Sequence, residues 1–162
     1  MKEYTEAEVL HRMAGLCSIK EYCAQEIEEK IRKTALPEEA CANIISYLQK
    51  QNFLDDNRYA NAFTKDKFRF NSWGKVRIAY ELRNKNIPAA IIEEALANID
   101  EDEYCAQLNS LLKAKRKITK GKNDYDISNK LLRFAAGKGF ESKYVYPALR
   151  AMFKDLPDEE IF

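Results

Sequence analysis

The sequence predicts an all-α protein of three tandem three-helix repeats, stacked into an elongated, curved solenoid. Three observations support this fold class. The 162-residue chain is rich in leucine, isoleucine, alanine, glutamate and lysine, with only three valines, five glycines and four prolines. Few β-branched and few turn-forming residues favour helices over strands. Apolar residues recur at helical spacing, and their pattern repeats about every 50 residues, as in repeat proteins.

The repeat is clearest in three segments, residues 24–45, 75–96 and 128–149, which align after shifts of 51 and 53 positions. Ile27, Ile78 and Leu131 then become equivalent. In each segment the apolar spacing is i, i+4, a break, and then i, i+3, i+4. Each segment therefore predicts two amphipathic helices joined by a tight turn.

Turn residues support these helix pairs. Pro37 and Pro88 suit the first turn of a helix. Asn86 and Gly139 stand just before the second helix of their pairs, where a left-handed C-cap favours glycine first and asparagine next. The first repeat has Ala35 at this place, which suits that backbone less well.

A further helix precedes each pair. In residues 4–17, Thr5 and Glu8 fit a capping box. In residues 53–70, either Asp55 or Asp56 caps the helix. We expect one apolar stripe on this helix; it comprises Tyr59, Ala62, Phe63 and Phe70. Residues 100–117 open the third repeat. The predicted repeats are 1–52, 53–99 and 100–162, and each is small enough to need a core shared with its neighbours.

The net charge is only +1, so any affinity for a polyanion must come from local patches. Residues 65–77 hold five basic side chains and one acid, and residues 113–122 hold six and none. Both segments end the first helix of a repeat, so stacking would give a shared basic ridge. The candidate binding residues are Lys65, Lys67, Arg69, Lys75, Arg77, Lys113, Lys115, Arg116, Lys117, Lys120 and Lys122.

Two interpretations of this ridge remain open. Lysines at helix C-termini can simply complement the helix dipole and solvate the surface. Alternatively, the ridge contacts phosphate or an acidic protein surface. The interleaved Phe68, Phe70 and Trp73 can stack on bases, but helical spacing favours Phe70 and Trp73 as core residues.

The sequence offers no convincing enzyme site, cofactor site or metal site. The four cysteines form no Cys-x-x-Cys pair, and His11 is the only histidine, so a zinc site is not expected. No P-loop pattern is present. Asp55 and Asp56 fit helix capping better than paired catalytic carboxylates. Free thiols without a signal peptide or a long apolar run predict a cytoplasmic protein without a membrane span.

Two motifs stand out in the predicted second repeat, "FLDDNRYANAF" (53–63) and "GKVRIAYELRNKNI" (74–87). Together they resemble the signature of the RecX family, bacterial regulators of the RecA recombinase. The resemblance depends on these positions: Phe53, Leu54, Asp55, Asp56, Arg58, Tyr59, Ala60, Gly74, Arg77, Ile78, Glu81, Leu82, Lys85 and Ile87. Family members commonly have glycine where this chain has Asn86, and the outer repeats match by pattern only.

The resemblance implies a three-repeat helical protein without catalysis of its own. It implies binding to the RecA filament on single-stranded DNA, and inhibition of RecA's ATPase, strand-exchange and co-protease activities. It is compatible with weak non-specific DNA binding and a monomer. Arg77 and Glu81 belong to the motif and are either an i,i+4 pair or partner contacts. The alternative is a stand-alone helical DNA-binding protein, but the helix predicted over 88–99 lacks the basic and amide side chains of a recognition helix.

Overall fold

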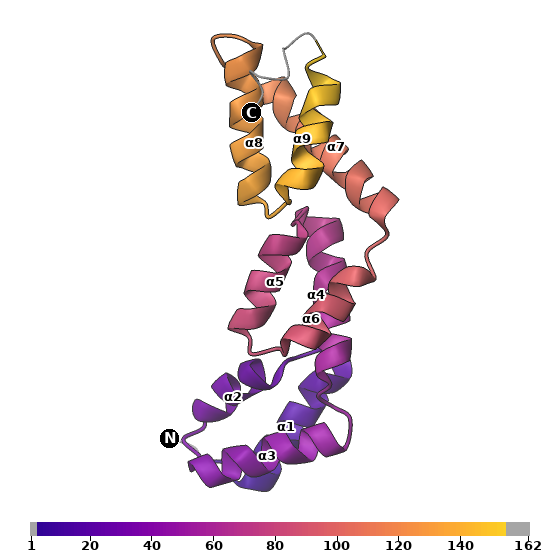
Figure 1. Cartoon of the computed structure of the whole chain (residues 1–162). Helices are drawn as coiled ribbons and strands as arrows, with labels where there is room; N and C mark the ends of the chain where they lie inside the picture. Colours follow the sequence, from indigo (N-terminus) through magenta and orange to yellow (C-terminus); the bar gives the residue numbers. More distant parts are fainter. Residues whose placement is uncertain (1–2, 155–162) are drawn as a thin grey trace. The chain divides into compact units, whose positions relative to one another are not determined.

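The computed structural model describes residues 3–154, which form α-helices and no strand (Figure 1). In chain order the helices are α1 (Glu6–Ile19), α2 (Ala24–Arg32), α3 (Glu38–Lys50), α4 (Asp56–Asn71), α5 (Lys75–Asn84), α6 (Ala89–Ala97), α7 (Glu101–Ile118), α8 (Asp124–Gly137) and α9 (Ser142–Met152). The all-α prediction is confirmed, with three helices in each predicted repeat. Among the helices described, none is long and apolar enough to cross a membrane.

The chain divides into two compact units. The first holds residues up to Phe63 together with Leu82–Ile92, and the second holds Thr64–Glu81 together with the residues from Glu93 onwards. The division runs through α4, α5 and α6. The repeat limits 1–52, 53–99 and 100–162, and the curvature of the stack, stay predictions.

The first helix of each repeat begins at a side-chain cap. Thr5 Oγ1 accepts from the Glu8 N–H at 3.2 Å, and Asp55 Oδ1 accepts from the Arg58 N–H at 3.0 Å. Asp100 Oδ2 caps α7 in the same way at 2.9 Å. These caps satisfy backbone donors that the first turn of a helix leaves without an intrahelical acceptor. Thr5 is therefore the expected cap, and of the two aspartates that the sequence offers, Asp55 is the one that caps α4.

The turns between the paired helices share one backbone conformation. Ala35, Asn86 and Gly139 all have positive φ, at 60°, 63° and 95°. Asn86 and Gly139 are the residues expected there. Ala35 takes up the same left-handed conformation although a β-carbon makes it unfavourable by about 1–2 kcal/mol. The hydroxyl of Thr34 donates to the Ile31 carbonyl at 2.5 Å and helps to close this first turn.

The apolar stripe of α4 differs from the prediction. Phe70 is 82% exposed, whereas Phe68 is 3% exposed and packs against Tyr104 with ring centroids 5.7 Å apart. The buried positions are Tyr59, as predicted, and then Ala60, Thr64 and Phe68, at i, i+4 and i+8. A residue two places beyond Phe68 points to the opposite side of a helix with 3.6 residues per turn. The prediction that Phe70 is a core residue is therefore wrong, and Trp73 is half-buried.

In the second unit, the start of α5 meets the turn between α8 and α9. The Gly74 N–H donates to the Lys138 carbonyl at 2.8 Å, and the Val76 N–H donates to the Gly139 carbonyl at 3.0 Å. A β-carbon on Gly74 would lie 2.4 Å from the Gly139 carbonyl, so only glycine permits this approach. We call this contact the α5–turn joint.

The buried Tyr104 of α7 completes the α5–turn joint. Its hydroxyl accepts from the Lys75 N–H at 2.9 Å and donates to Glu141. Burial, and then the hydrogen bond to Glu141, raise the pKa of Tyr104 well above its ordinary value. The hydroxyl thus stays protonated and holds α5, α7 and α9 together.

The first unit holds an equivalent contact made by side chains. The Asn86 amide donates to Gln25 Oε1 at 2.7 Å, and the Lys85 ammonium lies 3.6 Å from Glu26 Oε2. Gln25 and Glu26 correspond to Val76 and Arg77 in the repeat alignment. In both units, then, the left-handed turn of one repeat contacts the start of the second helix of the repeat before it.

Candidate partner-binding surface

All the predicted binding residues lie in the second unit, in two groups. The α4–α5 cluster comprises Lys65, Lys67, Arg69, Lys75 and Arg77. The α7 cluster comprises Lys113, Lys115, Arg116, Lys117, Lys120 and Lys122. Arg69 lies in the last turn of α4, and Lys115, Arg116 and Lys117 lie in the last turn of α7, where basic side chains complement the helix dipole. Lys75 and Arg77 lie instead in the first turn of α5.

Most of the α4–α5 cluster is engaged within the protein. Arg69 Nε lies 3.3 Å from Glu103 Oε1, so a carboxylate partly offsets its charge. The Lys67 ammonium and the Arg77 guanidinium lie 5.0 and 4.2 Å from the ring centroid of Trp73. Lys67 and Arg77 thus both make cation–π contacts with the Trp73 ring. Lys65 is exposed.

Arg77 also has a structural role in the α5–turn joint. Its backbone nitrogen would lie 2.5 Å from a β-carbon placed on Gly139. The structure shows no Arg77–Glu81 ion pair between these two described residues, because the guanidinium turns to Trp73 instead. Of the two alternatives for this motif, the i,i+4 pair is therefore not formed, and contact with a partner stays a prediction.

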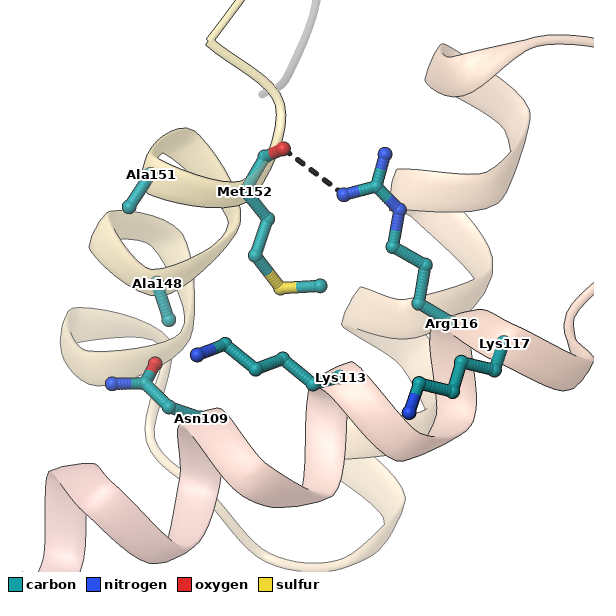
Figure 2. A pocket seen from close by; sticks show the side chains of 7 residues that line it. All are labelled: Asn109, Lys113, Arg116, Lys117, Ala148, Ala151 and Met152. Atoms are coloured by element: carbon teal, nitrogen blue, oxygen red, sulfur yellow. Dashed lines mark hydrogen bonds between the residues drawn. The ribbon is translucent and has the colours of Figure 1, made fainter.

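Two members of the α7 cluster hold neighbouring helices. Arg116 Nη1 donates to the Met152 carbonyl at 3.0 Å (Figure 2). The guanidinium also lies 4.2 Å from the Phe153 ring centroid. The Lys115 ammonium lies 4.8 Å from the ring centroid of Phe134 on α8. These two side chains therefore stabilise the packing of α8 and α9 on α7.

The loop after α7 places Lys120 and Lys122 at the surface with exposed side chains. Their backbones order the loop, because the Lys120 carbonyl accepts from Lys130 Nζ at 2.6 Å and the Lys122 N–H donates to Asp126 Oδ2 at 3.1 Å. This N–H, with the Lys130 ammonium, lowers the pKa of Asp126.

Lys113 and Lys117 are exposed, and among the described residues neither forms an ion pair or a side-chain hydrogen bond. They stand at i and i+4 on α7. Two like charges at this spacing repel each other by a few tenths of a kcal/mol. A carboxylate or phosphate bound between them would remove that repulsion.

Lys113 and Lys117 border a hollow between α7 and α9, shown in Figure 2. The hollow has a volume of about 540 Å³, and its lining residues are Asn109, Lys113, Arg116, Lys117, Ala148, Ala151 and Met152. A second hollow of about 380 Å³ shares Asn109, Ala148 and Ala151, and adds Cys105, Leu108, Lys143, Tyr144 and Pro147. Together they form what we call the α7–α9 groove, and none of the described residues that line it is acidic.

Sequence reasoning found the basic wall of the α7–α9 groove and missed its floor. Ala148, Ala151 and Met152 carry no chemistry that a motif search detects. A signal was nevertheless present on α7, since Cys105, Asn109, Lys113 and Lys117 follow one another at i+4 spacing. That spacing puts them on one helix face.

The two clusters are separated along α7. The C-terminal end of α4 packs against the beginning of α7, where Arg69 meets Glu103 and Gln107 Nε2 donates to Ser72 Oγ at 2.9 Å. Lys113 follows Glu103 by ten residues, which is about 15 Å along a helix. The basic surface is therefore two patches with different intramolecular contacts.

No group of three or more His, Cys, Asp or Glu residues in the described part of the chain is placed to hold a metal ion. All four cysteines are free thiols. Burial raises the pKa of Cys23, which favours its protonated form.

Comparison with known proteins decides the family. Residues 55–96 match the family model for RecX, second three-helix domain. The regulatory protein RecX of Prosthecochloris aestuarii is 31% identical over 149 residues, which cover 92% of this chain and 96% of that protein. The chain belongs to the RecX family. The regulatory protein RecX of Clostridium botulinum is 34% identical over 142 residues, and the match spans 63% of its length.

Solved RecX structures have the same fold. A crystal structure of RecX from Lactobacillus salivarius superposes with a TM-score of 0.76 at 19% identity, covering 91% of this chain and 96% of that chain. A second RecX crystal structure gives a TM-score of 0.80 at 22% identity, covering 93% and 72%. The helical architecture is therefore that of RecX.

Proposed function

We propose that this protein regulates the RecA recombinase by binding the RecA filament on single-stranded DNA. Binding mainly inhibits RecA's ATPase, strand-exchange and co-protease activities. The observation that carries the proposal is the match to a regulatory protein RecX across nearly the whole of both chains. The proposed mechanism is steric and conformational and needs no catalytic group of the regulator, which acts as a monomer in the cytoplasm.

The α7 cluster supports this proposal with a specific surface. Lys113 and Lys117 project from a regular helix, without intramolecular partners among the described residues. Helix α7 is itself fixed by buried Tyr104, Leu108 and Leu112. Because the helix backbone is already ordered, binding an acidic surface or a phosphate backbone would order only the lysine side chains.

The α4–α5 cluster has a supporting role in this proposal. Arg69, Lys75 and Arg77 already contact Glu103, Tyr104 and Trp73 respectively. Their charges stay partly exposed and contribute to the local field, which steers association with an anionic partner. Substituting them would also disturb the fold, so they are poor probes of binding.

The test is the ATPase rate of the cognate RecA on single-stranded DNA, measured while the protein is titrated in at constant salt and ATP. We expect strong inhibition at or below one regulator per RecA subunit. An unchanged rate with folded protein would exclude the proposal.

A stand-alone DNA-binding protein is the alternative function. Helix α6 carries Glu93 and Glu94 and no basic side chain, so it lacks the donors that read base edges. Binding of the protein to DNA without RecA, measured over a range of salt, separates the two functions. Weak, sequence-independent binding agrees with the regulator, and tight, sequence-selective binding would favour the alternative.

A further inference from the structure

We propose that the α7–α9 groove binds a short peptide segment that carries both acidic and apolar side chains. The inference deepens the proposed function, and rests on it for the source of the segment, which is the protein partner. Three features of the groove carry it: its charge, its floor and its length.

The charge of the groove is of one sign. Of the described residues, Lys113, Arg116, Lys117 and Lys143 line it, and no acidic one does. Arg116 is committed to the Met152 carbonyl and the Phe153 ring, whereas Lys113 and Lys117 form no ion pair with any described residue. Figure 2 shows the Lys113 side chain extending across the hollow toward Asn109 and Ala148. A carboxylate in the hollow would therefore meet a donor from α7 and the amide of Asn109.

The floor of the groove consists of apolar side chains, two of which are small. Ala148 and Ala151 stand at i and i+3 on α9, beside Met152 and Pro147. Small residues at this spacing let the backbone or an apolar side chain of a partner approach the helix closely. Burying apolar side chains against this floor gives binding free energy that a bare phosphate chain lacks.

The same floor disfavours single-stranded nucleic acid as the occupant. Sequence-independent binding of single strands combines a basic channel with aromatic rings on which bases stack. Among the described residues that line the groove, Tyr144 has the one aromatic ring, and it packs edge-on against Tyr104 at 5.1 Å. Its hydroxyl donates to Glu101 at 2.9 Å. Tyr144 is thus held by its own neighbours and does not offer a stacking platform.

The length of the groove suits a short peptide. The lining residues on α7 run from Cys105 to Lys117, twelve positions apart, which is about 18 Å of helix. That distance equals about five residues of extended chain or about three turns of helix. Most of the basic side chains lie at the Lys117 end, so we expect the acidic part of the segment there.

The experiment measures binding of the full chain to a fluorescein-labelled octapeptide that alternates aspartate or glutamate with leucine, by fluorescence anisotropy. K113Q/K117Q removes the two available charges and should weaken binding about ten-fold, because each exposed charge pair contributes modestly. A151L fills the floor at an exposed position and should weaken binding by a similar factor. K33Q/K50Q is the matched control, since it removes two exposed lysines at helix ends outside the groove, and should leave binding unchanged.

A second probe tests the class of ligand. Unlabelled oligothymidylate should compete poorly with the peptide. The inference is overturned if the peptide fails to bind, if A151L has no effect on its binding, or if oligothymidylate displaces it at lower concentration than the unlabelled peptide does. Circular dichroism is used to check that A151L is folded. K113Q/K117Q tests the groove independently, through its charges.

The RecA ATPase assay separates this inference from the proposed function. Inhibition of the ATPase without peptide binding would overturn the groove inference and leave the proposed function standing. If the groove variants weaken peptide binding but the wild type does not inhibit the ATPase, the groove binds such peptides and the proposed regulation of RecA is wrong.

Discussion

Substituting Gly74 by alanine tests how the α5–turn joint is built. A β-carbon there would lie 2.4 Å from the carbonyl carbon and oxygen of Gly139 and from the nitrogen of Phe140. All three are backbone atoms, so no side chain can rotate away. Overpacking of this kind costs about 1–3 kcal/mol. Moving the chains apart also breaks the hydrogen bonds from Gly74 and Val76, at about 1 kcal/mol each.

The gain from restricting the unfolded chain offsets about 0.4–1 kcal/mol of this cost. We therefore expect Gly74→Ala to lower the free energy of unfolding by about 2–4 kcal/mol, from the overpacking and hydrogen-bond costs above. Urea unfolding followed by circular dichroism at 222 nm measures it.

Gly15→Ala is the matched control, because Gly15 lies inside α1 and a β-carbon there meets no atom within 4 Å. It should raise stability by about 0.5–1 kcal/mol. Equal effects of the two substitutions, or a change below about 0.5 kcal/mol for Gly74→Ala, would refute the close approach of the two backbones.

Three further predictions concern single side chains. Tyr104→Phe should cost about 1–3 kcal/mol, because it leaves buried polar partners such as Glu141 unsatisfied. Since the pKa of Tyr104 is raised above its ordinary 10.0, the wild type should lose stability as pH rises above about 10, and the variant should lose less between pH 9 and pH 12. Ala35→Gly should raise stability by about 0.5–1 kcal/mol, since relief of left-handed strain exceeds the entropy cost of glycine; a lower melting temperature would contradict the positive φ. Phe68→Ala should lower the free energy of unfolding by about 3–5 kcal/mol, while Phe70→Ala should change it by no more than about 0.5 kcal/mol. Chemical denaturation measures both, and a larger loss for Phe70→Ala would contradict the burial of Phe68.

The sequence was sufficient to predict helices and turns wherever one residue type has one strong physical preference. Asn86 and Gly139 mark left-handed turns, and Thr5 and Asp55 mark helix starts. Ala35 shows the limit of this reasoning, because its backbone follows the packing of α2 and α3 and not its own preference. Tertiary packing outweighs a local cost of about 1–2 kcal/mol there.

The stripe of α4 shows a second limit. Phe68 and Phe70 both fit an aromatic helix, and two positions apart they face opposite sides. Which side is buried depends on the ring of Tyr104, which comes from a different repeat. Periodicity within one helix does not contain that information.

The basic clusters were predictable as segments but not as surfaces. Charge counting treats Lys113 and Arg116 alike, yet Arg116 anchors α9 and Lys113 does not. The contacts that distinguish them involve the Met152 carbonyl and the Phe153 ring, about 36 residues further along the chain. A probe that reverses Arg116 would therefore test folding as much as binding.

The most direct test of the central proposal is inhibition of the single-stranded-DNA-dependent ATPase of RecA by the wild type, by K113E/K117E and by K33E/K50E. Both variants change the net charge equally, and each replaces two exposed lysines without intramolecular partners among the described residues. We predict strong inhibition by the wild type and by K33E/K50E, with at least ten times more K113E/K117E needed for the same effect. A RecA rate unaffected by folded wild-type protein would contradict the proposed function, and equal inhibition by all three proteins would contradict the role of the α7 cluster.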